Sequence, residues 1–167
     1  PWTHRELAMR AIEGGRHVEM GPGDVFIKGA NALNYDKQQA GILIGHPTGG
    51  TIGAAIGTVV ARRATLLLPV GLEKNIPGDL NETYRLLVAA GTNGSGPMLW
   101  PVTGMIYTEL EAVQNVSGAQ ACLIGAGGIA SAEGAVWISV YGAPDQVDRA
   151  EGFIKDCQGE PPFVWPE

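Results

Sequence analysis

The chain has 167 residues, a formal net charge of −6 and a pI of about 5.0. This length predicts one domain, residues 1–167, with a sizeable core. The acidic balance argues against nucleic acid as a partner, because phosphate binding needs clustered Lys and Arg. The longest apolar run, residues 64–71, is too short to span a bilayer, so we expect no membrane partner.

The composition also carries predictions about assembly, the cysteines and the location of the protein. Glycine makes up 25 residues and charged residues only 17%, which favours tight loops and a surface partly covered by another subunit. We therefore expect a homo-oligomer, at least a dimer. Cys122 and Cys157 lack C-x-x-C spacing and predict buried thiols in a reducing cytoplasm, with a single disulfide as the alternative. No signal peptide is visible from Pro1 onward, so the expected location is cytoplasmic, and an upstream segment stays open.

Taken in chain order, the first half of the sequence predicts a strand–helix–strand unit. Buried strands are expected at 24–27, 40–45 and 65–70, and helices at 2–12 and 51–63. The segment AGILIG is apolar throughout, which predicts a strand buried on both faces. A strand, loop, helix and strand within about thirty residues form a right-handed βαβ unit in almost every case.

The second half continues the alternation of helices and strands. Helices are expected at 81–90, 108–116 and 144–157, and strands at 121–128 and 135–141. Thr108 with Glu111 three residues later is a capping-box pattern. In the proline-rich tail, 159–167, the aromatic side chains are expected to dock on other parts of the protein. The alternation predicts an α/β domain with a mainly parallel sheet.

A candidate anion site follows the first two strands. Lys28, Asn31 and Asn34 come just after the first, at the kind of strand end where open α/β sheets place their ligands. The segment GHPTGGT, residues 45–51, follows the second strand and opens a helix with Thr51 as its expected N-cap. Backbone N–H groups at such a helix start favour anions. The alternative is a glycine-rich turn that only lets helix and strand pack closely.

Other polar residues complete the candidate site. Glu73 and Lys74 follow the third strand and share its edge if the strands are parallel, although such a pair is also common on solvated surfaces. The predicted ligand-binding set is Lys28, Asn31, Asn34, His46, Thr48, Gly49, Gly50, Thr51, Glu73 and Lys74. The three histidines lie far apart in sequence, and neither H-E-x-x-H nor a Ser-His-Asp set is readable, so no metal site is expected.

One segment matches a cofactor motif in letters only. GAGGIA, residues 125–130, fits G-x-G-x-x-A, but the dinucleotide fingerprint needs a long helix opening at the third glycine. A strand is expected again by Ala135, which leaves no room for that helix. The segment is therefore interpreted as a structural turn, and no cofactor is expected.

The run DVFIKGANALN … AGILIG … TGGTIGAAIGTVVARRATLLLPVGLEK, within residues 24–76, resembles a known superfamily. This superfamily contains ribose-phosphate isomerase, glucosamine-phosphate deaminase and CoA transferases, and the resemblance is nearest to its lactate-utilisation and initiation-factor regulatory branches. It implies a Rossmann-like three-layer domain with ligands at the strand ends. Aligned on Gly29-Ala30, the isomerase carboxylates correspond to Lys28, Asn31 and Asn34. Since an amide cannot accept a proton at neutral pH, isomerase chemistry is expected to be lost.

Three hypotheses for the function follow. The favoured one is a domain that binds a small anionic metabolite, such as a sugar phosphate, nucleotide or carboxylate, without isomerase activity. The second is an enzyme of the superfamily with altered chemistry that uses Lys28, His46, Glu73 or Glu133. Glu133 stands in SAEG, loosely similar to the nucleophile turn of CoA transferases, although an exposed turn residue explains it as well. The third is a non-catalytic oligomerisation or regulatory module.

Overall fold

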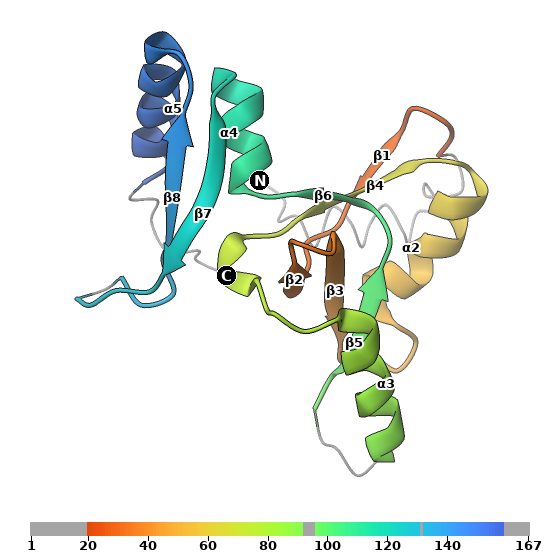
Figure 1. Cartoon of the computed structure of the whole chain (residues 1–167). Helices are drawn as coiled ribbons and strands as arrows, with labels where there is room; N and C mark the ends of the chain where they lie inside the picture. Colours follow the sequence, from red (N-terminus) through yellow and green to blue (C-terminus); the bar gives the residue numbers. More distant parts are fainter. Residues whose placement is uncertain (1–19, 92–95, 131, 159–167) are drawn as a thin grey trace, which may run out of the picture. The chain divides into compact units, whose positions relative to one another are not determined.

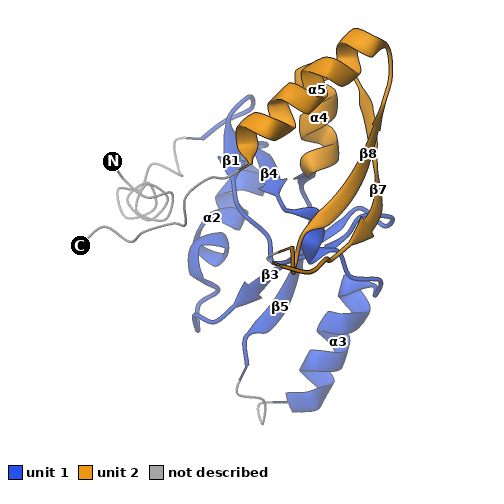
Figure 2. Cartoon of the chain, turned by 90° about the vertical axis from the view of Figure 1, so that its left-hand side faces the viewer, with its two compact units in different colours: residues 1–107 blue, residues 108–167 orange. Residues whose placement is uncertain are grey.

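The computed structural model describes residues 20–91, 96–130 and 132–158 and shows a mixed α/β protein (Figure 1). It divides into two compact units, residues 1–107 and 108–167 (Figure 2). The helix expected at 2–12 and the tail at 159–167 lie outside the described residues. That the chain forms a single domain stays a prediction. Within the described ranges, none of the helices combines the length and apolar character that crossing a bilayer requires.

The first sheet of unit 1, sheet A, is parallel and has the strand order β1-β4-β6. Its strands are β1 (Val25–Ile27), β4 (Thr65–Pro69) and β6 (Met105–Tyr107). Alternation along these strands buries Leu66, Leu68 and Ile106. The first strand was expected to be buried, and this is wrong: β1 is an edge strand, and Val25 and Ile27 are 53% and 58% exposed.

The second sheet of unit 1, sheet B, is antiparallel, with the order β2-β3-β5. Its strands are β2 (Ala32–Asn34), β3 (Gln39–Ile44) and β5 (Met98–Val102). The expectation of a mainly parallel sheet is therefore wrong for this part of the chain. The reason is local: only four residues, 35–38, separate β2 from β3, and so short a turn joins antiparallel strands.

Helix α2 (Gly50–Ala61) connects β3 to β4. The helix was predicted, and it buries Ile52, Ala55 and Val59. The predicted βαβ unit is wrong, because β3 belongs to sheet B and β4 to sheet A. The N-cap is also Gly49 rather than Thr51. Gly49 has a φ of 86°, a left-handed conformation that glycine adopts without steric cost.

The rest of unit 1 packs against sheet B. The short 3-10 helix η2 (Leu72–Lys74) is followed by α3 (Leu80–Ala90), which lies beside β5 (Figure 1). A small core cluster joins Ala32, Leu80 and Leu99, with Leu87 packed against it. The helix predicted at 81–90 thus corresponds to α3, which buries Leu80 and packs Leu87 against this cluster.

Unit 2 is a hairpin covered on one face by two helices (Figure 2). It consists of α4 (Glu109–Ser117), β7 (Gln120–Ala126), β8 (Val136–Tyr141) and α5 (Pro144–Cys157). Both helices were predicted, and the capping box is confirmed: the Thr108 N–H donates to Glu111 Oε2 over 2.7 Å. The core joins Val113, Ala119 and Ala150. Because β7 and β8 pair antiparallel, this sheet too departs from the expected mainly parallel arrangement.

Two further expectations for unit 2 can be compared with the structure. The segment 125–130 belongs to the end of β7 and the following turn, and the described residues between β7 and β8 contain no helix, as the turn interpretation requires. The cysteines, however, are exposed and not buried. Cys122 alternates with Ala121, which faces the helices, so the thiol points to the opposite face of the hairpin. Cys157 is the last residue of α5.

Candidate functional site

Half of the predicted ligand-binding residues meet at one pocket in unit 1. The pocket has a volume of about 180 Å³ and is lined by Lys28, Ile42, Leu43, Ile44, Gly45, His46, Gly49, Gly50, Thr51 and Ile52. The end of β1 contributes the lysine, the end of β3 contributes the histidine, and the first turn of α2 contributes the glycines and threonine. We call this cavity the anion pocket.

The first turn of α2 presents backbone donors to the anion pocket. The first N–H groups of any helix lack partners within that helix, and they form the positive end of its dipole. No side chain among the described residues caps them in α2, and its first turn contains no acidic residue. A tight loop precedes the helix, and a Cβ on Gly53 would lie 2.5 Å from the Thr48 carbonyl oxygen. Glycine at position 53 is therefore needed for this close approach.

Lys28 adds a positive charge to the same cavity. Its side chain is half-buried, and burial lowers the pKa of the ammonium from its ordinary value of 10.5. Nζ donates to the Gly29 carbonyl oxygen over 3.1 Å, the one acceptor it has among the described residues. An ammonium group has three donors. It can therefore still donate to an anion in the pocket.

His46 lines the anion pocket with a fixed tautomer. Its Nδ1 lies 3.2 Å from the Thr48 backbone N and 2.9 Å from Thr48 Oγ1. The backbone N–H can only donate, so Nδ1 accepts and the proton of the neutral ring is on Nε2. The predicted Thr48 thus orients His46 without lining the pocket itself. The Nε2–H group is what His46 can offer to a ligand.

Asn31 lies beside the anion pocket in a structural position. Its Oδ1 accepts a hydrogen bond from the Leu43 N–H over 3.0 Å, and its own backbone N–H donates to the Gly41 oxygen over 2.8 Å. Both bonds join the start of β2 to β3. The side chain therefore stabilises a strand that forms one wall of the pocket, since Leu43 is a lining residue.

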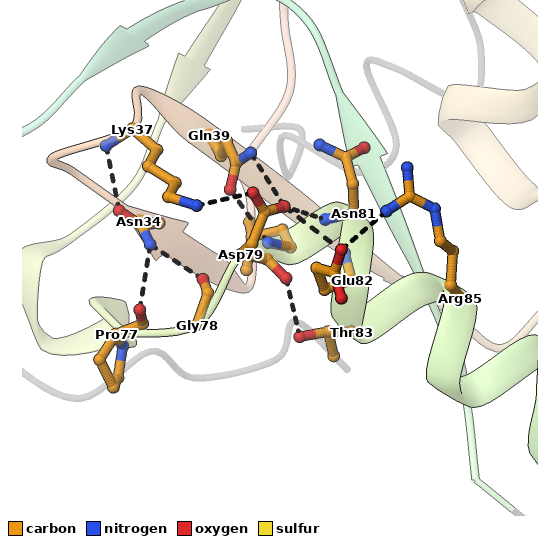
Figure 3. Close-up of polar contacts among 11 residues, drawn as sticks. Asn34, Lys37, Gln39, Pro77, Gly78, Asp79, Asn81, Glu82, Thr83 and Arg85 are labelled. Atoms are coloured by element: carbon orange, nitrogen blue, oxygen red, sulfur yellow. Dashed lines mark hydrogen bonds and ion pairs between the residues drawn. The ribbon is translucent and has the colours of Figure 1, made fainter.

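Asn34 is part of a different polar cluster (Figure 3). It is 5% exposed, and its Nδ2 donates to the Gly78 oxygen over 2.9 Å and, more weakly, to the Pro77 oxygen over 3.4 Å. Its Oδ1 accepts from the Lys37 N–H over 3.0 Å. A carboxylate could not donate to the two carbonyls. This requirement explains the amide at position 34 without reference to a lost catalytic acid.

The centre of that cluster is Asp79, which the sequence analysis did not single out. Its carboxylate accepts from Lys37 Nζ over 2.8 Å, from Gln39 Nε2 over 3.1 Å and from the N–H groups of Asn81 and Glu82 (Figure 3). The hydrogen bond from Lys37 is the largest of the causes that hold the pKa of Asp79 well below its usual range. We call Asn34, Lys37, Gln39 and Asp79 the Asp79 network. An Asp directly before an amphipathic helix is the pattern that could have revealed it.

Glu73 and Lys74 do not reach the anion pocket. Both belong to η2, where Lys74 Nζ lies 3.6 Å from Glu73 Oε1. The next residue, Asn75, bridges to Leu33 of β2, which places η2 beside sheet B. In unit 2, Glu133 is exposed in the turn before β8. Glu73 and Lys74 are thus not among the lining residues of the anion pocket.

Neither a candidate metal site among the described residues nor a known relative indicates the function. Across residues 20–91, 96–130 and 132–158, there is no group of three or more His, Cys, Asp or Glu side chains that could hold a metal ion. Comparisons with protein-family models, with curated proteins and with solved structures give no match. The superfamily resemblance accordingly stays a prediction, and function has to be argued from the pocket.

Proposed function

We propose that unit 1 binds a small anionic metabolite through a phosphate, sulfate or carboxylate group held in the anion pocket. One observation carries the proposal: a half-buried lysine and a helix N-terminus without a side-chain cap line the same cavity. The candidate ligands are a sugar phosphate, a nucleotide or a carboxylate. The backbone donors of the first turn of α2 and the Lys28 ammonium would share the negative charge.

The volume of the anion pocket suits the charged group of such a ligand. A pocket of about 180 Å³ is well above the roughly 10–15 Å³ that a cavity needs to hold one water molecule. Pockets for whole drug-sized ligands are larger, about 300–1,000 Å³. The anion pocket therefore has room for a tetrahedral anion or a carboxylate, and the rest of a metabolite would extend beyond it.

The expected affinity is modest. A helix N-terminus contributes about 0.3–1 kcal/mol to a nearby anion, and up to about 2 kcal/mol where the site is partly buried. A hydrogen bond from a charged donor such as Lys28 adds about 1.5–3 kcal/mol. Together these two terms amount to about 2–5 kcal/mol, which corresponds to a dissociation constant of roughly tenths of a millimolar to tens of millimolar. The entropy of association weakens binding further.

The pocket's chemistry favours binding over isomerisation. Its lining residues include no carboxylate, and Asn34 belongs to the Asp79 network. Ribose-5-phosphate isomerisation by the purified chain should therefore be undetectable. The resemblance over residues 24–76 implies ligands at the strand ends and a Rossmann-like three-layer arrangement. Both are part of the proposal. The layering rests on the resemblance, because the described residues leave Val25, Ile27 and Met105 exposed on one face of the parallel sheet A, whereas parallel sheets are usually covered on both faces.

The same exposed face favours a second candidate function, an oligomerisation module. A further copy of the chain that covered Val25, Ile27 and Met105 would remove apolar surface from water. This candidate predicts at least a dimer. Light scattering that gives the mass of a monomer across micromolar concentrations would contradict it.

Binding of inorganic phosphate, measured by titration calorimetry, tests the main proposal. Lys28→Ala should raise the dissociation constant by about 10- to 150-fold, the equivalent of one charge-assisted hydrogen bond. Lys28→Arg keeps the charge and should weaken binding less. Lys155→Ala removes an equal charge from an exposed ion pair on α5 and should leave the affinity unchanged. Phosphate that does not bind the wild type, or that binds Lys28→Ala equally well, would overturn the proposal.

A further inference from the structure

One face of the β7–β8 hairpin in unit 2 carries no charged side chain. Helices α4 and α5 cover the other face, which carries Ala121, Ile138 and Val140 (Figure 2). Because side chains alternate along a strand, the neighbours of these residues point away from the helices. They are Gln120, Cys122 and Ile124 of β7 and Trp137, Ser139 and Tyr141 of β8. We call the surface formed by these six residues the open face.

Two aromatic rings stand on the open face along β8. Trp137 and Tyr141 are 60% and 50% exposed, and Ile124 on β7 is 65% exposed. Trp137 Nε1 donates to the Gly127 oxygen over 2.9 Å, which fixes the orientation of the indole. The rings belong to residues four apart on one strand, so about 13 Å separates them at about 3.3 Å per residue. Surfaces lined by aromatic rings bind proline-rich segments in the polyproline II conformation.

The size of the open face fits a peptide segment better than a second copy of the chain. Two strands about 4.8 Å apart and about 20 Å long give a projected area of roughly 200 Å². A specific interface between two folded proteins buries about 800 Å² on each partner. A few side chains of an extended segment are enough to cover the open face.

The chain carries a proline-rich segment directly after α5, the tail at 159–167. Its sequence, GEPPFVWPE, contains three prolines and the apolar residues Phe163, Val164 and Trp165. The tail lies outside the described residues. Gln158, the residue before it, has φ −77° and ψ 144°, close to the polyproline II values of about −75° and +145°. The chain therefore leaves α5 in the conformation that proline-rich segments adopt when they bind.

The tail is long enough to reach the open face. Helix α5 runs back along β8, and its 14 residues cover about 21 Å at 1.5 Å per residue, close to the length of β8. The helix therefore ends toward the end of the hairpin where β8 begins and where Trp137 stands. Nine extended residues span up to about 30 Å. In the polyproline II conformation Pro161 and Pro166 are about 15 Å apart, similar to the spacing of the Trp137 and Tyr141 rings.

We propose that the open face binds the tail of the same chain, with the tail prolines against Trp137 and Tyr141. Burial of apolar surface favours this docking, and a preformed polyproline II conformation lowers its entropy cost. Cys122 lies opposite Ser139, which stands between the two rings on β8. A docked tail therefore covers the Cys122 thiol. The inference concerns unit 2 and does not depend on the anion pocket.

The rate at which Cys122 reacts with a thiol reagent tests the inference on the full chain. Cys157 is also exposed, so every variant carries Cys157→Ser. Phe163→Ser combined with Trp165→Ser should raise the rate roughly fivefold or more, the effect of releasing a tail that covers the open face about four-fifths of the time. Glu160→Gln keeps the prolines and aromatic rings of the tail and, as the matched control, should leave the rate unchanged. Equal rates with and without the two aromatic side chains would overturn the proposal.

The dependence of this rate on protein concentration separates docking within one chain from docking between chains. A tail that is tethered to its own open face binds at a fixed effective concentration. The Cys122 rate of the chain with the natural tail should therefore be the same across micromolar protein concentrations. Protection that increases with protein concentration would place the tail on a second copy of the chain and overturn the proposal.

Discussion

Two α-helix N-termini within the described part of unit 1, those of α2 and α3, each have a lysine nearby. They differ in whether a side chain of the protein supplies the anion. At α3 the carboxylate of Asp79 accepts from two first-turn N–H groups and from Lys37. At α2 the cap is Gly49, without a side-chain cap, and Lys28 lines the pocket in front of it. Asp79 thus supplies at α3 a carboxylate partner that no described side chain supplies at the start of α2. The comparison teaches that a helix start becomes a ligand site when its own sequence omits the carboxylate.

The largest effect should come from a charge placed in the Asp79 network. Asn34→Ala leaves the Lys37 N–H and the Gly78 oxygen without their partner, which should lower the free energy of unfolding by about 1–3 kcal/mol. Asn34→Asp should cost more, because a buried carboxylate would face two carbonyl oxygens. Chemical denaturation measures both. An Asn34→Asp variant as stable as wild type would contradict the structural role of this amide.

Substitutions at two glycines of α2 test how the loop before this helix, beside the anion pocket, packs. Gly53→Ala would place a methyl group against the Thr48 oxygen and should destabilise the protein by about 1–3 kcal/mol. Gly57, one turn later, has open space around its Cβ position. Gly57→Ala should therefore stabilise the protein by about 0.5–1 kcal/mol. Denaturation curves that give both variants the same sign would show that the loop before α2 does not pack as described.

A pH dependence of anion affinity is also expected. The pKa of Lys28 in the free protein is lowered by burial, and a bound anion would raise it again. As the pH rises through that lowered pKa, the ammonium loses its proton and sulfate affinity should fall by about tenfold, the difference between a charged and a neutral donor. Sulfate keeps its charge over this range, so the change reports the protein. Lys28→Arg, whose guanidinium stays protonated, should remove the fall, and a fall that persists in this variant would contradict the assignment.

Helices were predictable because their information is local. Apolar spacing and caps indicated α2, α3, α4 and α5 to within one or two residues. The pairing of strands was not predictable, since a strand's pattern of apolar residues shows which faces are buried but not which strand lies beside it. β2 and β6 have three residues each, too few to show any period. The error about a mainly parallel sheet follows from this limit.

In the candidate site too, local features were predictable and long-range contacts were not. Lys28, His46 and the glycines of α2 were predicted from their places after strands and before a helix, and they line one pocket. Asn34 fits the same sequence pattern but belongs to the Asp79 network, because the carbonyl groups to which its Nδ2 donates, those of Pro77 and Gly78, are 43 and 44 residues away in sequence. Asp79 was missed although its cap position is a local feature. Long-range hydrogen bonds decide which polar residues are structural, and a single sequence does not display them.

The most direct measurement is an NMR titration of the ¹⁵N-labelled wild-type chain with inorganic phosphate. The account predicts a saturable shift of the backbone amide at Gly50, with the amides of Asn81 and Glu82 unchanged because Asp79 already accepts from them. Saturable shifts centred on Asn81 and Glu82, or no saturable shift at the start of α2, would contradict the claim that this helix start binds the anion.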